Sequence, residues 1–73
     1  MRDDEYSKMT MNVLARIKEV RLAKNFKQEY IAARLGCSQN SYSKIEIGKT
    51  ELTLRKLFHI AAIIGVSATD LMV

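Results

Sequence analysis

The stretch that decides the fold is Gln28-Glu29-Tyr30-Ile31-Ala32-Ala33-Arg34-Leu35-Gly36-Cys37-Ser38-Gln39-Asn40-Ser41-Tyr42-Ser43-Lys44-Ile45-Glu46. Its first half places Ile31, Ala32 and Leu35 at helical spacing, which predicts an amphipathic helix over 28–35. Gly36 ends this helix, because glycine adopts the left-handed backbone of a tight turn without steric cost.

The second half of the stretch predicts another short helix, over 39–47. Ser38 is a favourable N-cap for it, and Tyr42 and Ile45 fall on its inward side. The residues that open this helix are small and polar. Two short helices joined by a tight turn have the layout of a helix-turn-helix, whose second helix enters the DNA major groove and reads bases with its N-terminal residues.

The sequence before this stretch predicts one helix. Val13, Leu14, Ile17 and Val20 recur at helical spacing, so the helix is expected over about 12–24. Asn25 suits the left-handed residue that ends it. Residues 1–11 are polar and lack periodicity, and are therefore expected to form a flexible N-terminal arm.

Two further helices are predicted after the stretch. Thr53 caps a helix over about 54–64, which Gly65 ends. Ser67 and Asp70 have the spacing of a capping box and open a last short helix. The expected architecture is all-α, a compact five-helix domain over 12–73.

Charge favours a polyanionic partner. The net charge is +4; residues 1–11 carry two basic and three acidic groups, and residues 12–73 carry ten basic and five acidic groups. A phosphate backbone attracts such a domain regardless of base sequence. Many small domains carry as much charge without binding nucleic acid, so the charge alone does not decide the function.

Composition excludes several classes. No apolar run approaches the roughly 20 residues of a membrane span, and the charged N-terminus lacks the apolar region of a signal peptide. The single Cys37 allows no internal disulfide and fits a cytoplasmic location. With one histidine, His59, and no converging acid–base cluster, we expect no catalytic site, no metal and no cofactor.

At this point the chain resembles the phage-repressor and Cro-like helix-turn-helix family, also called the Xre family. The resemblance covers about Val13 to Met72 and is carried by Ile17-Lys18, Val20-Arg21, Phe26-Lys27-Gln28-Glu29-Tyr30-Ile31-Ala32, Leu35-Gly36-Cys37-Ser38, Ser43-Lys44-Ile45-Glu46, Gly48-Lys49, Ile60-Ala61, Ile64-Gly65-Val66-Ser67 and Asp70-Leu71. It implies a five-helix domain that binds a double-stranded DNA operator as a dimer and acts in transcriptional control, in a prokaryotic or phage setting and at the nucleoid.

The family's base contacts fall on the helix over 39–47. By resemblance, Gln39, Asn40 and Lys44 contact bases, and Ser41 is a further candidate on the same exposed surface. The chemistry agrees, because Asn and Gln pair with adenine N6/N7 and Lys reaches guanine O6/N7. Polar residues on a short surface helix are also simply solvated in many proteins.

In the family, the residues that contact the DNA phosphate backbone flank that helix. The resemblance implies that Gln28 binds a phosphate and buttresses the first side chain of the recognition helix, and Ser43 is a further phosphate candidate. Lys27 replaces the usual Ser or Thr cap, so it leaves the helix start uncapped and adds a cation. In the loop after the recognition helix, the N–H groups and the side chain of Lys49, with Thr50, are expected to touch phosphate.

Two residues are implied to be structural rather than DNA-reading. The family pairs the positions of Arg21 and Glu46 in a partly buried ion pair, for which the planar guanidinium suits a carboxylate. Cys37 is expected to pack under the turn, with a redox-sensing thiol as the alternative.

The helix over 54–64 is more apolar than one buried face requires, since Ala62 and Ile63 stand where the family usually has polar residues. We therefore expect a homodimer interface formed by this helix, the last helix and the tail 71–73, with Ile60, Ile63, Leu71 and Met72 as its residues. Such a dimer implies a palindromic operator.

Two classes of function stay open. The first is a sequence-specific regulator that works by occupying an operator. The second is an antitoxin-type interaction protein that neutralises an unknown protein partner, with DNA binding for autoregulation.

Overall fold

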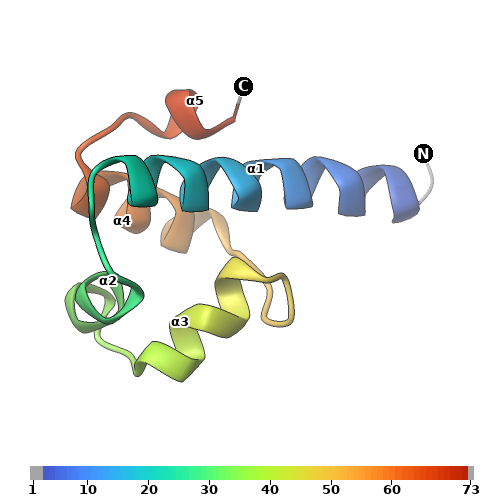
Figure 1. Ribbon diagram of the computed structural model, residues 1–73. Helices are drawn as coiled ribbons and strands as arrows, with labels where there is room; N and C mark the ends of the chain where they lie inside the picture. Colours follow the sequence, from blue (N-terminus) through green and yellow to red (C-terminus); the bar gives the residue numbers. More distant parts are fainter. Residues whose placement is uncertain (1–2, 73) are drawn as a thin grey trace.

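Five α-helices follow one another in the part of the chain that the structure, a computed structural model, describes: residues 3–72 (Figure 1). They are α1 (Asp3–Ala23), α2 (Gln28–Leu35), α3 (Gln39–Glu46), α4 (Leu54–Ile64) and α5 (Ala68–Leu71). The predicted all-α, five-helix architecture is confirmed. No helix among these residues is long and apolar enough to cross a membrane.

The helix α1 begins at Asp3 rather than near Asn12. Residues 3–11, predicted as a flexible arm, continue the helix and project beyond the other four (Figure 1). Since no glycine or proline interrupts this segment, nothing in its sequence ends the helix, and Asp4 and Glu5 suit its positive N-terminal end. Residues 1 and 2 of the predicted arm lie outside the described part of the chain, as does residue 73 of the predicted tail.

The helix ends follow the predicted caps. Asn25 has φ +62° and Gly36 has φ +81°, both in the left-handed region. The Thr53 hydroxyl accepts a hydrogen bond from the Lys56 N–H, and Ser67 with Asp70 forms the capping box that opens α5. Local chemistry therefore fixes where α2, α4 and α5 begin or end.

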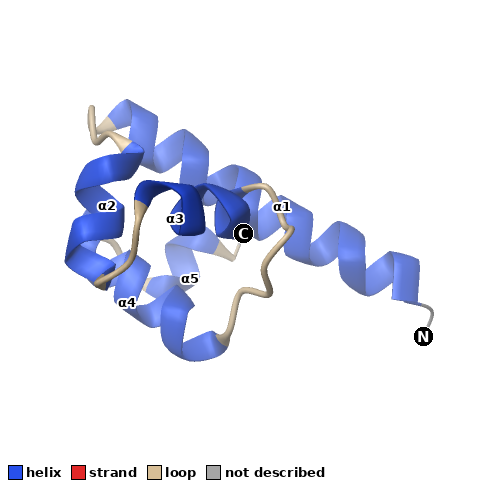
Figure 2. Ribbon diagram, turned by 90° about the horizontal axis from the view of Figure 1, so that it is seen from below, coloured by secondary structure: helices blue, strands red, loops and turns tan. Residues whose placement is uncertain are grey.

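The core joins all five helices. Its buried residues are Leu14, Ile17, Ile31, Ala32, Tyr42, Leu57, Ile60, Ala61, Ile64 and Leu71. Seen from below, α3 lies nearest the viewer with α2 beside it (Figure 2). The core therefore holds α2 and α3 from behind and leaves their outer surfaces open.

Burial corrects part of the predicted dimer interface. Ile60 and Leu71 are 0 % exposed, because they pack inside their own chain and are not available to a partner. Ile63 is partly buried, whereas Met72 is 58 % exposed. Of the four residues predicted for the interface, only these last two reach the surface.

Candidate nucleic-acid interface

A tight turn sets α3 against α2. The Gly36 N–H donates to the Ala33 carbonyl at 3.2 Å, and the Cys37 N–H donates to the Ala32 carbonyl at 3.0 Å. Cys37 is partly buried against the core, as predicted. The turn is therefore closed by backbone hydrogen bonds and anchored by a side chain, which fixes the direction in which α3 leaves it.

The first turn of α3 presents polar side chains to solvent. Ser38 is its N-cap, and the Ser38 hydroxyl accepts a hydrogen bond from the Ser41 N–H at 3.1 Å. Gln39 and Asn40 follow this cap and are exposed. The Ser41 hydroxyl is also exposed, but it accepts a hydrogen bond from Ser38 at 3.0 Å, which ties it to the cap.

Lys44 and Ser43 lie farther along the outer surface of α3. Lys44 is exposed and lies four residues after Asn40, so the two side chains share a helix face. Ser43 is partly buried. The surface that remains open on α3 thus consists mainly of two amides, one hydroxyl and one ammonium group, a set of donors and acceptors that matches base edges in the major groove.

A buried ion pair ties α3 to α1. Arg21 donates from Nε to Glu46 Oε2 at 3.0 Å and from Nη2 to Glu46 Oε1 at 2.9 Å. Only 7 % of the Arg21 side chain and 2 % of the Glu46 side chain are exposed. Arg21 Nη1 also donates to the Phe26 carbonyl at 2.8 Å, so the same guanidinium holds the chain between α1 and α2. The predicted pairing is present.

The groups around Glu46 keep it charged. Burial by itself raises the pKa of this carboxyl, but Arg21, the Tyr42 hydroxyl and the Gln28 amide together lower it below its ordinary value. Burial also raises the pKa of the Tyr42 phenol well above its usual range, and the adjacent carboxylate adds to that rise. The Tyr42 hydroxyl faces Glu46 but makes no well-formed hydrogen bond with any described residue.

Gln28 is positioned differently from the expectation. Its Nε2 donates to Glu46 Oε1 at 3.2 Å, near the C-terminal end of α3, rather than contacting the first side chain of α3. Gln28 is partly buried at the start of α2, and the preceding Lys27 is exposed and makes no side-chain cap hydrogen bond, as predicted. The start of α2 is therefore fastened to α3 through Gln28.

The loop after α3 uses its N–H groups internally. The Lys49 and Thr50 N–H groups both donate to the Lys44 carbonyl, at 2.8 and 3.1 Å, and the Gly48 N–H donates to the Ile45 carbonyl at 3.1 Å. The expectation that these N–H groups bind phosphate is therefore wrong in this conformation. The exposed Lys49 side chain and the partly buried Thr50 side chain remain as candidates.

Sequence reasoning did not single out a second group of cations, at the start of α4. Arg55 is exposed and Lys56 is partly buried in the first turn of α4, which contains no acidic residue. The signal was available in the sequence, because cations in a first turn oppose the helix dipole and are disfavoured without an anion. Among the described residues, no three His, Cys, Asp or Glu side chains are grouped to hold a metal ion.

The comparisons agree with this geometry. The family model described as helix-turn-helix matches residues 17–71. The HTH-type transcriptional regulator PrtR of Pseudomonas aeruginosa is 47% identical over 53 residues, which cover 73% of this chain and 20% of that protein. The SPbeta prophage-derived uncharacterized HTH-type transcriptional regulator YonR of Bacillus subtilis is 40% identical over 57 residues, 78% of this chain and 53% of that protein.

The chain thus spans about a fifth of one relative and about half of the other. No solved structure matches it significantly. The family model covers most of the chain, and its matched residues include the whole of α2, the turn and α3. This chain belongs to the helix-turn-helix family of the phage-repressor and Cro-like (Xre) type, a family of DNA-binding transcriptional regulators rather than enzymes.

Proposed function

We propose that this protein is a sequence-specific regulator of transcription that reads double-stranded DNA with α3 in the major groove. The observation that carries the proposal is the exposed polar surface of α3, a helix that the buried Arg21–Glu46 pair fastens to α1. Gln39 and Asn40 are assigned to adenine edges, Lys44 to guanine, and Ser41 to a further base contact. Each good bidentate contact is worth about 1–3 kcal/mol of discrimination between bases.

Contacts to the DNA phosphate backbone are assigned to side chains on both sides of α3. Lys27 and Gln28 stand at the start of α2, where free N–H groups and the helix dipole favour a phosphate. The side chains of Ser43, Lys49 and Thr50 are assigned to phosphates on the other side of α3. These groups supply affinity that falls with salt but carries no sequence information.

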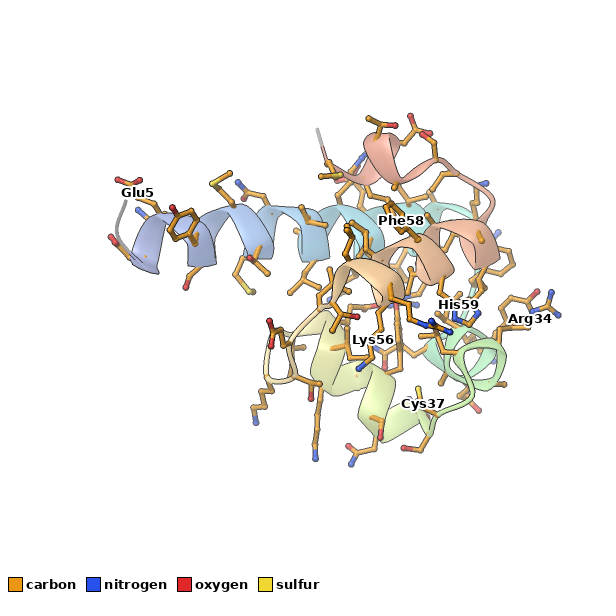
Figure 3. All side chains as sticks on the ribbon, turned by 180° about the vertical axis from the view of Figure 1, so that it is seen from behind. Glu5, Arg34, Cys37, Lys56, Phe58 and His59 are labelled. Atoms are coloured by element: carbon orange, nitrogen blue, oxygen red, sulfur yellow. The ribbon has the colours of Figure 1, made fainter. Side chains whose placement is uncertain are left out.

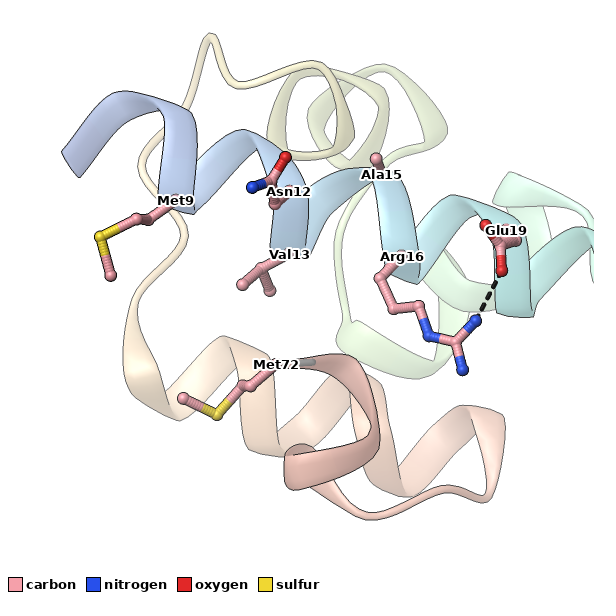
Figure 4. Close-up of a pocket in the computed structure, with 7 residues that line it drawn as sticks. All are labelled: Met9, Asn12, Val13, Ala15, Arg16, Glu19 and Met72. Atoms are coloured by element: carbon pink, nitrogen blue, oxygen red, sulfur yellow. Dashed lines mark hydrogen bonds and ion pairs between the residues drawn. The ribbon is translucent and has the colours of Figure 1, made fainter. Parts of the chain in front are cut away.

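A dimer fits the exposed apolar side chains of α1, α4 and the C-terminal segment. Met72 lines an open groove of about 460 Å³ together with Met9 and Val13 of α1 (Figure 4). We assign this groove, with the partly buried Ile63 of α4, to contact with a second copy, in place of the buried Ile60 and Leu71. A two-fold dimer would set two recognition helices about 34 Å apart on a palindromic operator. A regulator of this kind acts at the nucleoid, in the cytoplasm of a prokaryotic or phage-infected cell.

The test is binding by fluorescence anisotropy. A pool of randomised duplexes is enriched on the protein, and the enriched duplex is compared with its scrambled counterpart across a salt series. The proposal predicts that the enriched duplex binds about a thousandfold more tightly, with affinity falling steeply as salt rises. Equal and weak binding of both duplexes would contradict it and favour an interaction protein whose partner is another protein.

A further inference from the structure

An open pocket lies between α3 and the N-terminal half of α4, on the side of the molecule shown in Figure 3. Its volume is about 640 Å³, within the range of small-molecule sites in proteins. Lys56 and His59 extend from α4 on this side, and Cys37 lies at the turn across from them (Figure 3). Lys44 of α3 forms part of the same wall.

The rim of the pocket is positively charged. Lys44, Arg55 and Lys56 line it, and no carboxylate is among the described residues that do so. Arg55 and Lys56 stand in the first turn of α4, where the helix dipole already adds positive potential. An anionic group in the pocket would be attracted to all three cations and would relieve their unfavourable placement at this helix end.

Apolar side chains also line the pocket, beside the hydroxyl groups of Ser41, Thr50 and Thr53. Ile45, which is 4 % exposed, and the partly buried Leu35 line it from α3 and α2. A phosphate on a DNA backbone needs cations but gains nothing from a hydrophobic recess. An apolar recess beneath a cationic rim suits an anion that carries an organic group.

We propose that this pocket binds a small organic anion, a phosphate or carboxylate attached to an apolar group. The anionic head would pair with Arg55 and Lys56, and the apolar group would contact Ile45 and Leu35. Lys44 is shared between this pocket and the surface assigned to bases, so the bound anion would also attract the Lys44 ammonium group and draw it away from DNA. The regulatory part rests on the proposed function; the binding part does not.

The probe is phenyl phosphate, titrated into the isotope-labelled protein and followed by two-dimensional NMR. We expect saturable shifts concentrated at the amides of residues 44–45 and 53–59. Inorganic phosphate and benzyl alcohol should each bind about tenfold or more weakly, because each supplies only half of the interaction. The double variant Arg55→Gln/Lys56→Gln should bind phenyl phosphate about tenfold or more weakly.

A matched control removes two charges elsewhere. Lys8 and Lys18 are exposed on α1, away from the pocket, so Lys8→Gln/Lys18→Gln should bind the probe as the wild type does. Equal losses in both double variants would overturn the pocket assignment, as would shifts spread over the whole surface. If inorganic phosphate binds as tightly as phenyl phosphate, the pocket takes a bare phosphate and the organic-anion proposal is refuted.

A second experiment, DNA binding in the presence of the probe, separates this proposal from the proposed function. With the enriched duplex, saturating phenyl phosphate should weaken binding by the wild type and leave binding by Arg55→Gln/Lys56→Gln unchanged. Probe binding without any sequence-specific DNA binding would refute the regulator and leave the pocket standing. Specific DNA binding without probe binding would refute the pocket alone.

Discussion

The Arg21–Glu46 pair gives the sharpest prediction about how α3 is held. Replacing either residue with alanine leaves the other charge buried, with at most 7 % of its side chain exposed. Removing one partner of such a pair costs about 3–5 kcal/mol. A domain of 73 residues has a total stability of about 4–11 kcal/mol, so each single variant is expected to lose a large part of its stability.

The double variant separates the pairing from simple truncation. Two hydrogen bonds, of 2.9 and 3.0 Å, join the two side chains, and neither charge is left unpaired when both are removed. The loss in Arg21→Ala/Glu46→Ala should therefore be smaller than the sum of the single losses by about 2 kcal/mol. The coupling is not the whole cost, because Phe26 and Gln28 also lose hydrogen bonds to this pair.

Urea unfolding followed by circular dichroism measures all three variants, at low temperature so that the folded state is populated. The matched control is the Arg16–Glu19 pair on α1, which is far more exposed, with 37 % and 69 % of its two side chains accessible. Its single and double alanine variants are expected to couple by less than about 0.5 kcal/mol. Single losses below about 1 kcal/mol, or additive losses, would refute the argument that the buried pair supports α3.

Three further predictions concern pH, the turn and the cap. The folded-state pKa of Glu46 is lowered, so its contribution to stability is present above the unfolded-state pKa and disappears as pH falls through the folded-state pKa. The stability lost in Glu46→Gln, measured by urea unfolding, should therefore be largest near pH 7 and shrink toward pH 3. A loss that does not change with pH would contradict this. In Gly36→Ala the added Cβ meets no atom within 4 Å, but the backbone must keep φ at +81°. Calorimetry should therefore show a loss of stability of about 1–2 kcal/mol, and no loss would contradict the left-handed turn. Ser38→Ala removes the hydrogen bond to the Ser41 N–H and should cost about 1 kcal/mol in urea unfolding, whereas the conservative Ser38→Asp should retain most of it.

Local chemistry made much of the fold predictable. The C-terminal end of α2, the start of α3 and both ends of α4 depend on local chemistry. The residues responsible are Gly36, Ser38, Thr53 and Gly65, whose backbone preferences or side-chain oxygens act within one turn. The partnership of Arg21 with Glu46 came from the family resemblance, since no local pattern joins residues that are 25 positions apart.

Other features depend on packing between distant segments. The burial of Ile60 and Leu71 follows from α1, α4 and α5 meeting in one core, which an apolar pattern alone does not distinguish from an interface. Similarly, the Lys49 and Thr50 N–H groups bond to the Lys44 carbonyl only because the loop folds back on α3. The start of α1 was missed because the expectation required an apolar stripe, whereas residues 3–11 remain helical without one.

The pocket between α3 and α4 also depends on packing between distant segments, and the sequence therefore did not predict it. The first turn of α4 marks Arg55 and Lys56 as unusually placed cations, but only the fold shows that they line one pocket with Lys44. The helices were thus predictable from the sequence, whereas a pocket formed by side chains of several helices was visible only in the folded structure.

The most direct test of the central proposal is the specificity ratio, the affinity for the enriched duplex divided by the affinity for its scrambled counterpart. In Gln39→Ala/Asn40→Ala, this ratio should fall by about tenfold to a thousandfold while binding to the scrambled duplex stays the same. The control Ser7→Ala removes an exposed polar side chain from α1, outside the groove assigned to a second copy, and should leave both affinities unchanged. If the double variant keeps the wild-type ratio, α3 does not read the bases through these two amides, and the proposal is contradicted.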